Sequence, residues 1–162
     1  MFFCNDMKTF IKTFDELTTG ELYEIFKARF DVFVMEQHCF YLDMDDIDYH
    51  AIHIFMTESQ QVMAYARLFP QSFTPELPIP QPNEKDAWHF GRLLTRRRGI
   101  GLGKQMVETI LQVAEQNHAK TIYIEAQTHA IGFYEKFGFQ VISEPFEEAG
   151  IMHVEMKKIL CE

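Results

Sequence analysis

A chain of 162 residues, of which 47% are hydrophobic and 14% aromatic, can fill the core of one globular domain, so intrinsic disorder is excluded. Its net charge of −9 argues against general nucleic-acid binding, which needs a basic surface. The cysteines Cys4, Cys39 and Cys161 form neither a disulfide framework nor a zinc motif. No signal peptide and no apolar run of ~20 residues is present. We therefore expect a single cytoplasmic domain over residues 1–162, without a membrane partner.

The N-terminal half is predicted to hold a strand, a helix and a hairpin. The strand covers 8–14 and the helix about 20–36, where apolar residues recur at helical spacing and Thr18 with Glu21 forms a capping box. The acidic segment 41–48 is predicted to be a loop. Residues 50–57 and 61–69 alternate as the two strands of an antiparallel hairpin. Between residues 70 and 86 five of the six prolines accumulate, so this stretch is a connection.

The C-terminal half is predicted to contain a parallel crossover. A strand over 88–95 leads through a glycine-rich turn into an amphipathic helix from Leu102 to about Asn117, and a strand over 120–127 follows. A short helix over 129–139, with Gly138 as its C-cap, precedes strands at 140–143 and 151–159, which are joined by a turn at 144–150. We expect an α/β fold whose mixed, mostly antiparallel sheet contains a central β-α-β unit.

Positive charge and glycine meet only in "RRRGIGLGK", residues 96–104. Four of the six arginines lie between Arg92 and Arg98, and no Asp or Glu occurs from Ala87 to Val107, which favours a local anion site over a solvated basic turn. A P-loop would require glycine at Arg98 and Ser or Thr at Gln105. A dinucleotide fingerprint would require glycine at Lys104. Both alternatives are excluded.

What remains is an R-x-x-G-x-G run from Arg98 to Gly103, placed between a predicted strand and a predicted helix. Its glycines let the loop turn so that successive N–H groups point inward, and the helix N-terminus adds unpaired donors and partial positive charge. A pyrophosphate is the ligand that suits such a loop, and Lys104 can neutralise a further phosphate at the edge of the loop.

The R-x-x-G-x-G run resembles the acyl-CoA-binding motif of the GCN5-related N-acetyltransferase (GNAT) family. The segment "FYEKFGF" at 133–139, about thirty residues downstream, resembles the Phe-Tyr…Gly-Phe segment of that family. The chain is also similar to the ElaA-like branch of the family at 28–48, 64–70, 126–139 and 147–156. It departs from that branch in "TRRR", 95–98, where the turn is about two residues shorter.

The resemblance implies the GNAT fold and a place for acetyl-CoA in the gap where two central strands splay apart. The diphosphate would lie on the glycine-rich loop and the pantetheine along the preceding strand, where one backbone N–H would polarise the thioester carbonyl. The cofactor-binding residues that the resemblance implies are Leu93, Leu94, Thr95, Arg98, Gly99, Ile100, Gly101, Leu102, Gly103, Lys104 and Phe133.

The resemblance also implies two catalytic roles. Tyr134 matches the tyrosine that protonates the departing CoA thiolate, and a phenol can donate a proton while itself neutral at pH 7. Glu125, a charged residue in an apolar strand, is the first candidate for the base that deprotonates the acceptor amine, with His153 and His53 as alternatives. If the face of Glu125 is open to solvent, this residue is an ordinary exposed side chain.

The predicted function is N-acetyl transfer from acetyl-CoA to a primary amine of a small molecule or a peptide. The attack is expected to be direct, because none of the cysteines lies in a recognisable Cys–His arrangement. The acidic loop with Asp43, Asp45, Asp46 and Asp48 lacks the glycine and the final Glu of a calcium loop, so no metal is expected and the loop is interpreted as solvated. The alternative function is a non-catalytic acyl-CoA sensor, and homodimers are common in the family.

Overall fold

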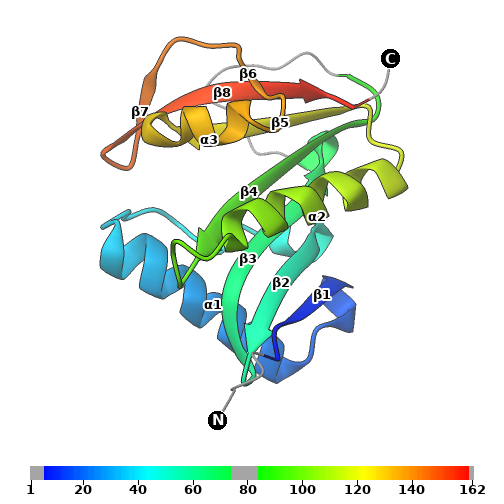
Figure 1. Cartoon of the computed structure of the whole chain (residues 1–162), viewed down its shortest axis with the longest axis vertical. Helices are drawn as coiled ribbons and strands as arrows, with labels where there is room; N and C mark the ends of the chain where they lie inside the picture. The colour runs from blue at the N-terminus through cyan, green and yellow to red at the C-terminus, as the bar shows by residue number, and fades with distance from the viewer. Residues whose placement is uncertain (1–5, 74–83, 161–162) are drawn as a thin grey trace.

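The computed structural model describes residues 6–73 and 84–160, and its centre is one twisted sheet (Figure 1). The sheet has eight strands in the order β1-β2-β3-β4-β5-β8-β6, and β7 also pairs with β8. Among the described residues the β4–β5 pair alone is parallel, and every other pair is antiparallel. The predicted fold class, a mostly antiparallel mixed sheet around a β-α-β unit, is confirmed.

The N-terminal elements follow the prediction closely. After β1 (Lys8–Thr13), α1 (Thr19–Arg29) begins at a capping box in which Thr18 Oγ1 accepts from the N–H of Glu21 and the Glu21 carboxylate accepts from the N–H of Thr18. The predicted helix to residue 36 is continuous, but Phe30–Glu36 are wound as a π-helix. A π-helical turn inside a longer helix is a feature that often marks a functional site.

The predicted hairpin is formed by β2 (Ile52–Glu58) and β3 (Gln61–Pro70). Ser59 and Gln60 join them with φ of 50° and 66°, the left-handed pair that a two-residue hairpin turn requires. β4 (Ala87–Thr95) pairs with β3 on its other edge. Of the predicted proline-rich connection, residues 74–83 lie outside the described residues.

The C-terminal half contains α2 (Leu102–Gln116), β5 (Thr121–Gln127), α3 (Ile131–Glu135), β6 (Gln140–Val141), β7 (Phe146–Glu148) and β8 (Ile151–Ile159). The predicted helix over 129–139 is shorter than expected, because Thr128–Ala130 form a 3-10 turn and α3 ends at Glu135; Gly138, with φ of 85°, lies in the turn that follows. The expected turn over 144–150 was partly wrong, since Phe146–Glu148 form strand β7 and pair with the start of β8.

Helices cover both faces of the sheet because side chains of a strand alternate between them. On one face Met106 and Ile110 of α2 pack against Leu68 and Ile122 in the larger core. On the other face Ile25 and other apolar residues of α1 pack against Tyr65 and the end of β4 in a second core. The β5–β8 pair and α3 form a separate wing, and β4 runs between this wing and β1–β3 (Figure 1).

Candidate active site

The site lies where β4 and β5 stop pairing. Their parallel register runs from Ala87–Thr121 to His89–Tyr123 and then ends. Between the pairs Arg67–Gly91 and Tyr65–Leu94, two residues of β4 oppose one of β3, which makes a β-bulge with Arg92 at φ 55°. A bulge turns a strand locally, so the remainder of β4 is directed away from β5 and a cleft of about 940 Å³ opens beside it.

Seven of the residues predicted to act on the cofactor or thiolate line this cleft; they are Leu93, Leu94, Thr95, Arg98, Gly103, Phe133 and Tyr134. The other predicted cofactor residues, Gly99, Ile100, Gly101, Leu102 and Lys104, belong to the loop and first turn of α2 and do not line it. Leu102 is buried in the larger core. Lys104 is exposed and lies 3.8 Å from the Glu108 carboxylate.

The glycine-rich loop has the backbone that the sequence predicted. Gly99 and Gly101 have φ of 79° and 82°, and a Cβ on either would meet nothing within 4 Å, so glycine is needed there for conformation. Gly101 is the N-cap of α2 and contributes no side chain to it. The first N–H groups of α2 therefore have no side-chain cap, which leaves them available to an anion. A Cβ on Gly103 would lie 3.4 Å from the Phe133 ring.

The three consecutive arginines of the loop each form an ion pair with a carboxylate of the protein itself. Arg96 donates to the Asp31 carboxylate, and Arg97 Nη2 donates to Glu58 at 2.6 Å. Arg98 alone of the three lines the cleft, where it is exposed and bonds Glu36 at 2.6 Å. Arg96 and Arg97 therefore pair with carboxylates from distant positions in the sequence, and of the three only Arg98 was predicted to bind the cofactor.

The acidic loop is not solvated, contrary to our expectation. Asp43, Asp45 and Asp48 form ion pairs with three arginines, Arg29 of α1, Arg67 of β3 and Arg92 of β4. The Arg29 side chain is fully buried, which by itself lowers its pKa, but its interactions with Tyr65, Asp48 and Asp43 raise the pKa of Arg29 overall. A buried guanidinium requires such compensation. The loop therefore ties α1 to the strands on either side of the bulge.

Tyr134 lies in a group of aromatic rings at the cleft. Its ring centroid is 5.1 Å from that of Phe133 and 6.0–6.1 Å from those of Phe139 and Phe90. Burial raises the pKa of Tyr134 well above its usual value, so the phenol stays protonated at neutral pH. Within the described part of the chain no group hydrogen-bonds to its hydroxyl, which leaves the proton available to a bound molecule.

Glu125 also lines the cleft and is half-buried, so it is not an ordinary solvent-exposed side chain. Burial, followed by the charge and hydrogen bond of Glu148, raises its pKa to about 8. Glu155 stands opposite Glu125 in the β5–β8 register and is 3% exposed, and burial raises its pKa to about 7. Sequence reasoning missed Glu148 and Glu155, although Glu155 is also a charged residue between apolar neighbours.

The three histidines near the site differ in their access to it. His153 lines the cleft and its Nδ1 lies 2.8 Å from the Ile151 carbonyl. His53 is enclosed in the interior, where Tyr65 and the Asp48 carbonyl occupy both ring nitrogens, so it cannot serve as the base. His89, which sequence reasoning missed, lines the cleft, stacks on Tyr123, and has its pKa lowered by burial to about 4.

Among residues 6–73 and 84–160, no group of three or more His, Cys, Asp or Glu side chains is arranged to hold a metal ion. No helix within those ranges has the length and apolar character to cross a membrane.

Comparison with known proteins identifies the family. Residues 19–160 match the family model described as an acetyltransferase (GNAT) domain. A UPF0039 protein of Synechocystis is 36% identical over 147 residues, 88% of this chain and 89% of the relative. Protein ElaA of Escherichia coli is 30% identical over 148 residues, 88% and 90% of the two chains, and its crystal structure superposes with a TM-score of 0.80.

A crystal structure of an acyl-CoA N-acyltransferase from Pseudomonas aeruginosa has a TM-score of 0.83 and 30% identity, and the match covers 94% of this chain and 99% of that one. The family model and these relatives each span most of the chain, and the residues that match the model include β4, β5 and the glycine-rich loop between them. The chain therefore belongs to the GNAT acetyltransferase family.

Proposed function

We propose that this protein transfers an acetyl group from acetyl-CoA to a primary amine. The observation that carries the proposal is the cleft between β4 and β5, which is lined by Gly103 in the uncapped first turn of α2, by Tyr134 and by Glu125. A thioester held along β4 would lie between a proton donor and a proton acceptor. That arrangement suits the attack of an amine on an acyl carbon with departure of a thiolate.

The cofactor would be held mainly by backbone groups. Its diphosphate would accept from the free N–H groups at the start of α2, and Arg98 would exchange its exposed Glu36 partner for a phosphate oxygen. The pantetheine would run along the edge of β4 at Leu93, Leu94 and Thr95, which β5 leaves unpaired. One N–H beside the bulge would then stabilise the developing oxyanion.

Proton transfers complete the proposed reaction. The amine nitrogen attacks the thioester carbon and loses a proton to Glu125, whose raised pKa makes it a stronger base than an ordinary carboxylate. The C–S bond breaks, and the Tyr134 hydroxyl gives its proton to the departing thiolate. The products are an amide and free CoA, and no covalent enzyme intermediate is formed.

The test is CoA release from acetyl-CoA over a mixed library of amines, measured with a thiol reagent against a reaction without amine. We expect amine-dependent release together with a rise in Tm on adding acetyl-CoA. A Tm rise without amine-dependent release would instead support the acyl-CoA sensor, since a sensor needs only the loop. No Tm rise at saturating acetyl-CoA would contradict the cofactor assignment.

A further inference from the structure

Two glutamates, Glu125 and Glu148, line the cleft, and a third, Glu155, lies beside Glu125 in the interior. Glu125 and Glu155 are directly opposite each other in the antiparallel β5–β8 pair, so their side chains share one face of the sheet. The last residue of β7, Glu148, hydrogen-bonds to Glu125 and is exposed. The three form a series from the solvent-exposed rim at Glu148, through the half-buried Glu125, to the interior at Glu155.

The innermost carboxylate has nothing to neutralise it. Among the described residues neither oxygen of Glu155 has a hydrogen-bond partner, although the side chain is 97% removed from solvent. A buried carboxylate without a partner is costly, and native proteins rarely retain one without a function. This orphaned group on the face of Glu125 distinguishes the cluster from an ordinary patch of acidic surface.

The positively charged side chains near these glutamates already form ion pairs with other carboxylates. Lys157, two residues along β8 on the same face, donates to Glu84 at 3.0 Å. Arg92 across the cleft is bound to Asp43 and Asp45. A carboxyl–carboxyl hydrogen bond between Glu125 and Glu148 requires one proton. With that proton shared, the cluster still contains more negative charge than the described residues compensate.

We propose that these glutamates form a subsite for a second positive charge on the acceptor, which would be an aliphatic diamine. The inference rests on the proposed function and names the acceptor class for that same site. Glu125 takes the proton of the reacting amine, Glu148 holds the other ammonium group, and Glu155 favours both when it is ionised. Phe33 and Leu42 line the same cleft and provide apolar walls for the carbon chain between the two amines.

An acceptor with a terminal carboxylate would meet repulsion at this subsite instead of attraction. The discrimination can therefore be measured with three ligands of the same chain length that differ only at one end. Diaminobutane with both amines terminal presents a second cation, aminobutane a methyl group, and aminobutanoate with its amine at the far end a carboxylate.

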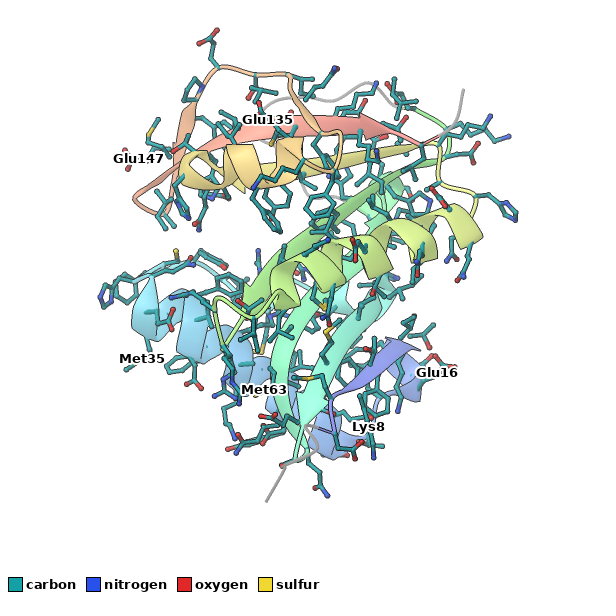
Figure 2. The ribbon with its side chains drawn as sticks, viewed as in Figure 1. Lys8, Glu16, Met35, Met63, Glu135 and Glu147 are labelled. Atoms are coloured by element: carbon teal, nitrogen blue, oxygen red, sulfur yellow. The ribbon has the colours of Figure 1, made fainter. Side chains whose placement is uncertain are left out.

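The experiment measures the Kd of each ligand by calorimetry with the full chain saturated with CoA. We expect diaminobutane to bind at least tenfold more tightly than aminobutane, and aminobutanoate to bind least. Glu148→Gln should remove most of the preference for the diamine. Glu147→Gln is the matched control, because Glu147 is exposed on the same strand, is labelled in Figure 2, and does not line the cleft. This control should retain the preference.

Equal Kd values for diaminobutane and aminobutane would overturn the subsite, as would equal losses in Glu148→Gln and Glu147→Gln. Glu155→Gln offers a second check at pH 8, where the Glu155 carboxyl, with a pKa of about 7, is mostly ionised: removing its charge should weaken diamine binding several-fold and leave aminobutane binding within twofold. Because this experiment measures binding, its result is independent of the test for acetyl transfer. Selective diamine binding without CoA release from acetyl-CoA would reject the transferase and retain the subsite.

Discussion

Arg92, the residue at the β4 bulge, donates from Nε to Asp43 Oδ1 at 2.9 Å, while the other oxygen of that carboxylate accepts from Arg29 Nε at the same distance. One aspartate thus links α1 to the strand along which we place the pantetheine. Arg92 adopts φ 55°, a conformation that costs a non-glycine residue about 1 kcal/mol or more. Its guanidinium also lies 4.6 Å from the centroid of the Tyr41 ring, a cation–π contact that offsets the strain.

We expect Asp43→Asn to reduce the free energy of unfolding by about 3 kcal/mol, because the fully buried Arg29 and the strained Arg92 both lose a carboxylate. Urea unfolding followed by circular dichroism measures the change. Asp46→Asn is the matched control, since Asp46 lies in the same loop, is exposed and belongs to no ion pair among the described residues. Its cost should stay within about 0.5 kcal/mol. Equal losses of unfolding free energy in the two variants would show that the ion pairs of Asp43 do not stabilise the fold.

Gly101→Glu tests the phosphate loop. The variant places a carboxylate at the N-cap of α2, where it would compete with and repel the diphosphate, so the Tm rise on adding CoA should disappear. Gly101→Ala is the control for backbone strain, because φ of 82° costs any L-residue about 1–2 kcal/mol while nothing lies within 4 Å of the new Cβ. Both variants should lower the Tm of the free protein, and only the glutamate should abolish the CoA effect. Loss of that effect in both would assign it to the strain.

Tyr134→Phe separates binding from thiolate protonation. The ring packing against Phe133 and Phe139 is retained, so CoA binding and KM should change less than twofold. The loss of a positioned proton donor should reduce kcat by about 10²-fold. Tyr123→Phe removes a hydroxyl that bonds Glu84 outside the cleft and should leave kcat nearly unchanged. An unaltered kcat in Tyr134→Phe would remove this residue from the mechanism.

Local features of the fold were predictable because they depend on neighbours in the sequence. The Thr18–Glu21 capping box, the hairpin turn and the start of α2 at the glycines each rest on residues within a few positions. The short strand β7 was not predictable in this way. Phe146–Glu148 is stabilised as a strand by pairing with the start of β8, and not by a pattern of its own.

The ion pairs of the site were likewise not predictable, because they join residues that are distant in the sequence. The sequence identifies an acidic segment and a group of arginines, but Asp45 and Arg67 are 22 positions apart, and only the fold brings them to 2.6 Å. The glutamate cluster likewise depends on the register between β5 and β8, because a shift of one residue would place Glu155 on the other face of the sheet. Glu125 could be proposed from its strand, whereas the origin of its raised pKa could not.

The dependence of stability on pH tests the buried glutamates. The folded-state pKa values of Glu125 and Glu155 lie near 8 and 7, above the value of 4.5 for a free glutamate, so folding favours their protonated forms. Stability is therefore lost as pH rises from 4.5 and the loss is complete above about 8. His53 and His89, whose pKa values burial lowers, act in the opposite direction and only below about 6.5.

Between pH 6.5 and 8.5 the free energy of unfolding should consequently fall by about 2–3 kcal/mol in the wild-type protein. The slope should be smaller in Glu155→Gln, and Glu147→Gln should keep the wild-type slope. Arg92 and Glu148 also act on Glu125, so both residues stay unchanged in this comparison. Chemical denaturation at each pH provides the measurement. A wild-type stability that rises over this interval would contradict the burial of these carboxyl groups in their neutral form.

Glu125→Gln tests the general base through the pH dependence of the rate. With a pKa of about 8, the ionised fraction of Glu125 rises from about one tenth at pH 7 to about nine tenths at pH 9, so kcat/KM for an amine should rise up to about tenfold from this group. The variant should lose about 10²-fold or more in rate at pH 8 and retain only the rise caused by deprotonation of the amine itself. Glu147→Gln should preserve the full wild-type profile. If Glu125→Gln and the wild-type protein show parallel pH profiles, the proton leaves the amine by another route, and His153 on the same cleft becomes the next candidate.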